Sequence, residues 1–507
     1  METIIPNQIL RKTDSAVDFF EIQSLNFPIP DIESYILYDA GEIELRQNLF
    51  RDIFDCPQLL EKYEKLSEQM ENLSECFQKS GEDRDNESII YSLIKIQSFT
   101  EIIDYIADTL YPLTENHKIK AKSMVDFINA CVSVAESESY NNVKSWLNNL
   151  DSNLQNIKSI TMGVNLDAQF KVNELGIVSF NTSPFVGGGV INSVFRDENP
   201  DESYQCMISL GISETKKLLG RSIISVNNEI FNAMNTVFKG TLKKIRRDIL
   251  NSFKQEAISL VGVGNDMAFI IQSARYVMSL KQKGGSLVFP KVSDSHRILN
   301  LYNPNLLYKV GIEKLVSNNV EMDKDNRIFV LTGPNSGGKS VYLNSIGIAQ
   351  IFFQLGLPIP ASVAEMKPFQ TIATIYVKSM DKTNDGRLAS EVTRLKDCLQ
   401  NLRDNSMILL DETFSSTSAF EGVFLAESLI KYLSKMGFYT VYVTHFHELS
   451  QCIKELNKDE KYSIHMLTAQ NIDGKRTYKI EPYYGFESEK SLAKDIVIEN
   501  GLGFLFE

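Results

Sequence analysis

Apolar residues recur at helical spacing over residues 43–160, a stretch rich in Leu, Ile, Glu, Lys and Asn and nearly free of Gly. The apolar positions that carry this spacing include Leu45, Leu49 and Ile53, then Ile89, Leu93 and Ile96, then Ile102, Ile103, Ile106 and Leu110. Residues three and four apart share one face of a helix, so the pattern predicts a series of amphipathic helices. Pro57 and Pro112 lie where we expect helix ends. Residues 1–40 are less periodic, and we expect them to be partly extended.

The period changes after residue 158. Two short β-type runs, 159–165 and 175–180, flank a polar turn and predict a hairpin. A Gly-rich loop at 184–189 follows, and a second helical region is expected from about 203 to 283.

Beyond residue 286, buried strands are predicted at 327–332, 407–410 and 439–444, with helical segments between them. Strands that alternate with helices imply a doubly wound and mostly parallel sheet. We therefore predict a multidomain protein, an all-α helical core followed by an α/β domain. Its expected parts are an N-terminal segment 1–40, a helical core or lever domain 41–285 with a small β-hairpin insertion near 159–190, and an α/β domain 286–507.

Composition supports a globular protein. The 507 residues are 43% apolar and 23% charged, and this length suggests about three domains. The net charge of −13 argues against coating nucleic acid by bulk charge, although phosphate contacts depend on local Lys and Arg. No signal peptide and no run of about 18 uninterrupted apolar residues is visible, so we expect a cytoplasmic protein without a membrane span. The six cysteines are widely spaced and predict reduced thiols, and the five histidines suggest no metal cluster.

A glycine-rich motif follows the first buried strand. The motif fits G-x-x-x-x-G-K-S and consists of Gly333, Pro334, Asn335, Ser336, Gly337, Gly338, Lys339 and Ser340. In this setting between a strand and a helix, backbone N–H groups and the helix N-terminus favour phosphate oxygens. We expect Lys339 to neutralise the β- and γ-phosphates of ATP, and the Ser340 hydroxyl to ligate Mg²⁺. A plain glycine turn with a surface lysine is the alternative.

Two acids end the second buried strand. Asp411 lies where a carboxylate can hold the Mg²⁺ shell, and Glu412 can polarise the attacking water. The acids alone are a weak signal, but together with the glycine-rich motif they predict an ATP hydrolase. His445 follows the third strand and is expected to sense the γ-phosphate through a hydrogen bond; a purely structural histidine is the alternative.

These motifs together resemble the MutS ATPase family. Residues 332–340, residues 411–422 and the Thr444-His445-Phe446-His447-Glu448-Leu449 element are each similar to a MutS segment. Residues 43–52 and 157–167 are similar to the helical core of short MutS-related proteins. The resemblance implies an ABC-type P-loop NTPase domain that dimerises and couples ATP to movement of a helical body. An ABC transport subunit is disfavoured because Lys339 and Asp411 are too close in sequence and no L-S-G-G-Q segment occurs.

The chain departs from the MutS pattern at several positions. In the family's signature segment, S-x-F-x-x-E, the Ser is expected to touch the nucleotide of the partner subunit; here the segment runs from Gly386 to Glu391, and Gly386 replaces that Ser. Arg387 either supplies a substitute contact or is a plain helix start. Ser415 and Ser416 stand where the family has Arg-Gly. Asn303 stands where the segment that opens the ATPase domain usually has His.

Mismatch recognition is not expected. Phe19-Phe20-Glu21 matches the letters of the mismatch wedge F-x-E. We interpret it as a coincidence, because about 40 residues before the helical core cannot hold the N-terminal mismatch-binding domain. Backbone contacts to DNA remain open. A basic run on a presumed helix either binds phosphates or is a solvated face; it comprises Lys239, Lys243, Lys244, Arg246, Arg247 and Lys254, near Lys216, Lys217 and Arg221.

Two functions from different classes follow. The leading hypothesis is a MutS-like, DNA-associated ATPase in DNA repair or recombination, a homodimer through its ATPase domains, with ATP and Mg²⁺ as cofactors. The alternative is a nucleotide-gated protein–protein switch that never grips DNA.

Overall fold

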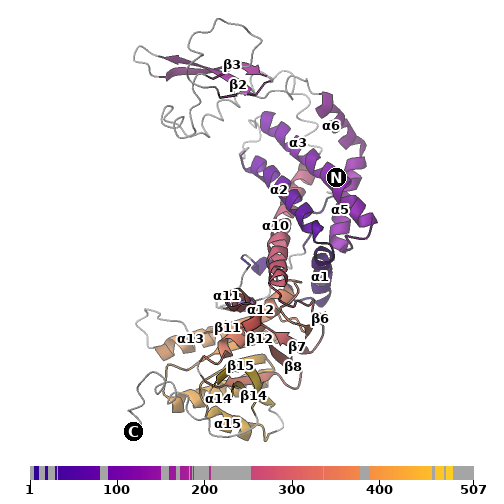
Figure 1. Cartoon of the computed structure of the whole chain (residues 1–507). Coiled ribbons are helices and arrows are strands. Elements are labelled where there is room, and N and C mark those ends of the chain that lie inside the picture. Colours follow the sequence, from indigo (N-terminus) through magenta and orange to yellow (C-terminus); the bar gives the residue numbers. More distant parts are fainter. Residues whose placement is uncertain are drawn as a thin grey trace. The chain divides into compact units, whose positions relative to one another are not determined.

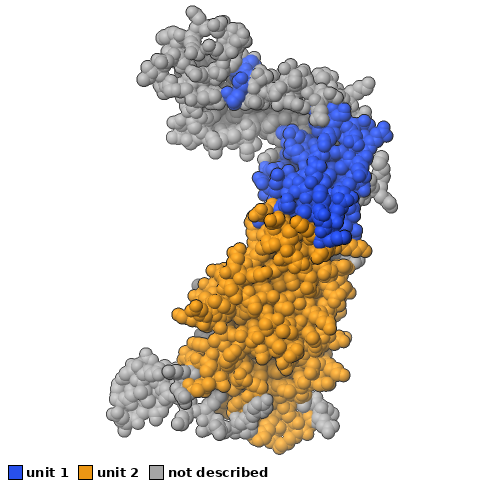
Figure 2. All heavy atoms as spheres, turned by 45° about the vertical axis from the view of Figure 1, so that its right-hand side comes forward, with its two compact units in different colours: residues 1–9, 62–117, 125–267 blue, residues 10–61, 118–124, 268–507 orange. Residues whose placement is uncertain are grey.

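The protein is described here from a computed structural model (Figure 1). The structure describes residues 5–10, 18–20, 25, 29–30, 32–79, 89–149, 159–166, 172–181, 183–184, 186–187, 205–206, 253–334, 336–376, 387–459, 463–472 and 475–483. The chain divides into two compact units (Figure 2). Unit 1 comprises Met1–Ile9, Lys62–His117 and Val125–Met267, and unit 2 comprises Leu10–Glu61, Lys118–Met124 and Ala268–Glu507. Residues 10–61 thus cluster with the C-terminal part, and the domain limits drawn from sequence stay a prediction.

The N-terminal region is helical, as the apolar spacing predicts. Its helices are α1 (Ala40–Asp55), α2 (Gln58–Lys79), α3 (Ile89–Tyr105), α4 (Tyr111–Glu115), α5 (Lys122–Glu136), α6 (Glu138–Asn149) and, later in the chain, α10 (Lys254–Gln282). Asp39 caps α1, because its side chain accepts the Glu42 N–H at 2.9 Å. Leu45 is 48% exposed, although it was expected on the buried face; Ile43 lies on that face instead, and two residues along a helix turn the side chain through about 200°.

Pro112 lies near a helix boundary, as predicted, and it marks the start of a helix. The chain passes from α3 through one π-helical turn, Ile106–Leu110, directly into α4, in whose first turn Pro112 lies. Proline lacks an N–H and is tolerated in the first turn of a helix, and a π-bulge rearranges the preceding carbonyls. At Pro57 the prediction is confirmed, since α1 ends at Asp55 and α2 begins at Gln58.

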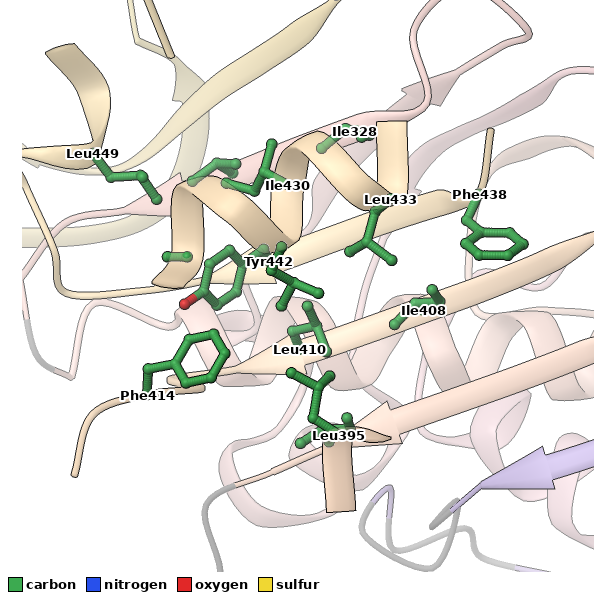
Figure 3. Packing of buried hydrophobic residues seen from close by; sticks show 14 of the residues in the cluster. Ile328, Leu395, Ile408, Leu410, Phe414, Ile430, Leu433, Phe438, Tyr442 and Leu449 are labelled. Carbon is green, nitrogen blue, oxygen red and sulfur yellow. The ribbon is translucent and has the colours of Figure 1, made fainter. Parts of the chain in front are cut away.

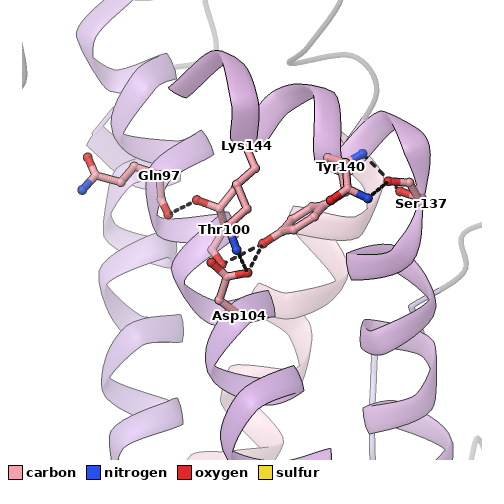
Figure 4. Close-up of polar contacts among 7 residues, drawn as sticks. Gln97, Thr100, Asp104, Ser137, Tyr140 and Lys144 are labelled. Atoms are coloured by element: carbon pink, nitrogen blue, oxygen red, sulfur yellow. Dashed lines mark hydrogen bonds and ion pairs between the residues drawn. The ribbon is translucent and has the colours of Figure 1, made fainter. Parts of the chain in front are cut away.

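A polar cluster joins α3 and α6 within unit 1 (Figure 4). The Tyr140 hydroxyl lies 2.9 Å from Asp104 Oδ1 and 3.0 Å from the Thr100 carbonyl oxygen, and Lys144 Nζ donates to Asp104 Oδ1 at 2.8 Å. Tyr140 is 1% exposed, so its hydroxyl has exchanged water for these partners. Burial, followed by the neighbouring Asp104 charge, raises the pKa of Tyr140.

The predicted hairpin is present. Strands β2 (Ser159–Leu166) and β3 (Val172–Asn181) pair antiparallel. Strands β4 (Val186–Gly187) and β5 (Gln205–Cys206) form a short parallel pair, so residues 205–206 are not helical as expected. Most of the second helical region, with the basic run except Lys254, lies outside the described residues.

Helix α10 is, by length and composition, apolar enough to cross a membrane, and it is the one helix among the described residues that passes this test. Within the protein, 61% of its most apolar window is buried. Burial of this kind is typical of a core helix.

A seven-stranded sheet forms the centre of the C-terminal part. Its order is β1-β11-β12-β13-β9-β14-β15. The strands are β1 (Asp18–Phe20), β11 (Thr371–Ile375), β12 (Ser406–Asp411), β13 (Tyr439–Val443), β9 (Ile328–Thr332), β14 (Ile464–Ile472) and β15 (Lys475–Pro482). All neighbours are parallel except β14 and β15. The three predicted strands are confirmed as β9, β12 and β13, and the α/β nature of this region is confirmed with them.

Strand β1 comes from the N-terminal segment. Phe19 pairs with Ile372 of β11 at the edge of the sheet, so this part of the F-x-E letters belongs to the α/β layer. Glu21 lies outside the described residues.

Helices flank the sheet and complete its core. They are α12 (Lys339–Gln354), α13 (Arg387–Gln400), α14 (Ala419–Met436) and α15 (Leu449–Leu456). Figure 3 shows one cluster of buried side chains between α14 and the strands, in which Leu433 lies near Ile408 of β12 and Phe438. Continuous apolar strands such as β12 and β13 are buried along their whole length, as expected for parallel strands covered by helices.

A second sheet has four strands, three of which precede α12 in the sequence and one of which follows it. These strands were not predicted. Its order is β6-β10-β7-β8. The elements of this region are β6 (Lys291–Val292), β7 (His296–Leu301), α11 (Pro304–Val310), the 3₁₀ turn Ile312–Lys314, β8 (Asn318–Met322) and β10 (Val363–Met366), with a further 3₁₀ turn at Glu33–Tyr35.

Candidate nucleotide site

A glycine-rich loop connects β9 to α12. Its backbone has positive φ at Gly333 (+121°), Ser336 (+64°) and Gly338 (+94°). Glycine adopts this region without steric cost, whereas Ser336 must be held there by its surroundings. Because α12 begins at Lys339, the free N–H groups of its first turn face the loop. Asn335 lies outside the described residues.

Strand β14 presses against this loop. A Cβ on Gly337 would lie 2.9 Å from the Ala469 Cβ and 2.9 Å from the Pro334 carbonyl oxygen. Tyr478 of β15 lies over Gly338, 3.5 Å from the position of a Cβ there. The close approach of β14 therefore requires glycine at 337, which the motif alone does not explain.

Lys339 is buried inside the loop. It is 5% exposed, and its Nζ donates to the carbonyl oxygens of Gly333 at 2.6 Å and of Pro334 at 3.1 Å. The Lys339 ammonium is thus held beneath the loop backbone, where it can contact an anion bound by the N–H groups of α12.

Asp411 ends β12 close to the start of α12. Burial, the largest cause, raises its pKa, and the nearby Glu412 raises it further, whereas a hydrogen bond with Ser340 and the charge of Lys339 lower it. Its Oδ1 is buried and has no hydrogen-bond partner. A carboxylate oxygen and a hydroxyl are ligands that Mg²⁺ prefers. An unused buried oxygen beside Ser340 therefore fits a divalent cation, with the remaining ligands from nucleotide and water; no cluster of three or more His, Cys, Asp or Glu suited to a metal occurs among the described residues.

Glu412 and His445 lie at the carboxyl ends of adjacent strands. Glu412 has φ +53°, and its N–H donates to the carbonyl of Val443, the last residue of β13, at 2.8 Å. His445 is exposed, and its ring centroid lies 4.5 Å from that of Phe446. Because β12, β13 and β9 are neighbouring parallel strands, Glu412, His445 and the glycine-rich loop all lie at the carboxyl ends of these strands, on the same side of the sheet.

Tyr376 and Asn344 lie near the carboxyl ends of these strands, and the motifs did not identify them as site residues. Tyr376, just after β11, hydrogen-bonds Asn344 of α12, and burial, then the charge of Asp411, raises its pKa. Asn303 caps α11, accepting the N–H groups of Asn305 and Leu306. The only feature of the sequence that could have indicated Tyr376 as a site residue is its position directly after the end of β11.

The signature helix is described from its second residue onward. Gly386 lies outside the described residues, and α13 begins at Arg387. Glu391 Oε2 accepts the Phe414 N–H at 3.1 Å, which links α13 to the segment after Asp411.

Known proteins resemble this chain over the same region. The family description MutS domain V matches residues 329–489. The chain is 29% identical over 243 residues to DNA mismatch repair protein MutS of Macrococcus caseolyticus, covering 42% of this chain and 29% of that protein. It is 28% identical over 335 residues to DNA mismatch repair protein MutS of Prochlorococcus marinus, covering 65% and 35%. It is 32% identical over 163 residues to human MutS protein homolog 4, covering 32% and 17%.

The match begins in β9 and includes the glycine-rich loop and the acids that end β12. The molecule is thus a helical protein with a C-terminal α/β domain of the MutS domain V kind, which is an ATPase domain. Residues 329–489 match MutS domain V, and the similar proteins are named MutS or MutS homolog, as the resemblance of the motifs predicted. It spans 17% to 35% of the length of these three relatives.

Proposed function

We propose that this chain binds Mg-ATP at the loop 333–340, a P-loop, and hydrolyses it. The observation that carries the proposal is the buried Oδ1 of Asp411, which has no partner although it lies beside Ser340 and Lys339. A buried unpaired carboxylate oxygen is costly, so a ligand that would satisfy it is a physical reason for its presence.

Each residue has a proposed role. The Lys339 ammonium leaves the loop carbonyls to neutralise the β- and γ-phosphates, and Ser340 and Asp411 hold the cation. Mg²⁺, when bound, neutralises charge on the phosphate oxygens. Glu412 orients and polarises the attacking water, and His445 senses the γ-phosphate. The backbone N–H groups of the loop 333–338, of which Pro334 has none, cradle the phosphates.

ATP-dependent dimerisation is part of this proposal. Phe420 and Phe424 lie one turn apart near the start of α14 and are 87% and 65% exposed. Large exposed aromatic side chains are enriched where proteins meet. Because the acids 411 and 412 lie a few residues before α14, a second copy seated here would adjoin the nucleotide site.

DNA is the proposed macromolecular partner. The relatives from Macrococcus and Prochlorococcus are named DNA mismatch repair proteins, and we propose a role in DNA repair or recombination with phosphate-backbone contacts. Retention on duplex and branched DNA that weakens steeply with salt would support this, whereas salt-independent or absent retention would favour a nucleotide-gated protein–protein switch.

The test of the ATPase separates binding from chemistry. Lys339→Ala should lose tight ATP binding, because the buried cation is removed. Glu412→Ala should still bind ATP but hydrolyse it at least about 10²-fold more slowly. Lys435→Ala, an exposed lysine in the last turn of α14, should behave as the wild type. Equal loss of ATP binding in the Lys339 and Glu412 variants would contradict the assigned roles.

A further inference from the structure

The turn that carries Glu412 has an unfavourable backbone. Glu412 and Phe414 both have positive φ, at +53° and +69°, and neither is glycine. Side chains with a Cβ rarely adopt this region, so contacts from elsewhere must hold the turn. Those contacts decide where the Glu412 carboxylate points.

Three hydrogen bonds anchor three consecutive residues of this turn. The Glu412 N–H donates to the Val443 carbonyl at 2.8 Å, and the Tyr442 hydroxyl donates to the Thr413 carbonyl at 2.8 Å. The Phe414 N–H donates to Glu391 Oε2 at 3.1 Å. The first two anchors come from β13, which neighbours β12 in the sheet. The third comes from α13.

The ring of Phe414 adds a fourth restraint. It is 4% exposed and belongs to the buried cluster that also contains Tyr442 and Leu410 (Figure 3). With the ring buried and the N–H held by Glu391, both sides of the last turn residue are fixed. Glu391 supplies a charged acceptor, and such hydrogen bonds are stronger than neutral ones.

Helix α13 is itself tied to the site at a second point. Arg394, one turn after Glu391, donates to the Tyr376 carbonyl at 3.0 Å. Tyr376 lies near Asp411, whose charge acts on it. The position of α13 is therefore linked to both acids of the site.

We propose that Glu391 is a positioning residue for Glu412. By accepting the Phe414 N–H it holds the left-handed turn in which the water-activating carboxylate is aimed. The role rests on the proposed ATPase function, and Glu391 acts through the backbone without touching nucleotide. A shift of α13 would release the turn, so the helix that the family places at the facing subunit could adjust hydrolysis in its own subunit.

The experiment compares Glu391→Ala, Glu391→Gln and the control Asp397→Ala, which removes an exposed acid from the same helix. Glu391→Ala should lower kcat at least about tenfold while KM and ATP affinity stay within about threefold, because only the aim of Glu412 is lost. Glu391→Gln keeps an acceptor oxygen and should recover most of kcat. Asp397→Ala should match the wild type.

Hydrogen exchange provides a readout that is independent of activity. Without nucleotide, the Phe414 amide should exchange at least about tenfold faster in Glu391→Ala than in the wild type, and Asp397→Ala should leave it unchanged. A kcat within twofold of the wild type in Glu391→Ala, or parallel loss of kcat, ATP affinity and melting temperature in both Glu391 variants, would overturn the proposal. A wild-type chain that binds no ATP would refute the proposed function instead, and the exchange of Phe414 would still test whether Glu391 holds the turn.

Discussion

His296 should make the C-terminal part of the protein sensitive to mild acid. Its side chain is fully buried in β7, and neither ring nitrogen has a hydrogen-bond partner. The ring lies 5.9 Å from that of Phe369. Burial lowers the pKa of His296 from 6.5 to about 3. The imidazole is therefore neutral in the folded protein at every pH at which the protein would be studied.

The sign and size of the effect follow from this shift. The unfolded chain takes up a proton on His296 near pH 6.5, but the folded protein does not until about pH 3. The stabilisation is complete above pH 6.5 and is lost as the pH falls toward 3. Each pH unit in this window costs at most about 1.4 kcal/mol, so lowering the pH from 7.5 to 5 should cost about 2 kcal/mol from this residue alone.

The assay is urea unfolding of the wild type, His296→Leu and His447→Gln at several pH values between 7.5 and 5. Hydrogen exchange of the β7 amides is measured alongside, because it reports the unfolding of the unit that contains His296. The two units need not unfold together. His296→Leu should lose about 2 kcal/mol less than the wild type over this range, whereas the exposed control should not differ. Carboxylates titrate in all three proteins and cancel in the comparison. Identical pH dependence in the wild type and His296→Leu would refute the reasoning.

Two further predictions concern partners. Glu412→Ala with Mg-ATP should sediment as a dimer, and Phe424→Ser should weaken that dimer by removing an exposed aromatic contact; a strict monomer at tens of micromolar with normal hydrolysis in the wild type would contradict the homodimer. The affinities for homoduplex and single-mismatch DNA, measured by competition, should agree within about threefold, and Phe19→Ala should change neither affinity. A mismatch wedge must be presented by a rigid domain, whereas Phe19 lies in an edge strand beside Ile372. A mismatch preference of tenfold or more that disappears in Phe19→Ala would restore the wedge.

Local patterns were sufficient where the structure is locally determined. The strands β9, β12 and β13 are short apolar runs followed by turn or acidic residues, and buried parallel strands require such runs. The position of the loop after β9 followed from the same pattern. Strands such as β11 and β7 were missed because polar residues interrupt their apolar runs.

The finer geometry of the site could not be predicted from motifs. That Gly337 must be glycine depends on Ala469 of β14, far along the chain. The positive φ of Glu412 and Phe414 has no residue-type signal, because neither is Gly or Asn. Sequence reasoning thus identified the residue types that chemistry requires, while packing between distant segments determines their placement.

The same limit applies to the other end of α12. Gln354, its last residue, is fully buried; its Nε2 donates to the carbonyls of Leu37 at 2.6 Å and Phe369 at 2.9 Å, and its Oε1 accepts the Phe369 N–H at 3.0 Å. The Leu37 N–H in turn donates to the Gln354 carbonyl at 2.9 Å. No periodicity could pair residues so far apart in sequence. Yet the 16 residues of α12 span about 24 Å as one rigid rod, with Lys339 at one end and the segment that leads into α1 held at the other. Because a helix transmits a shift along its axis rather than absorbing it, a movement of its first turn would displace Leu37. This is a physical route for the coupling of ATP to a helical body that the resemblance of the motifs implies.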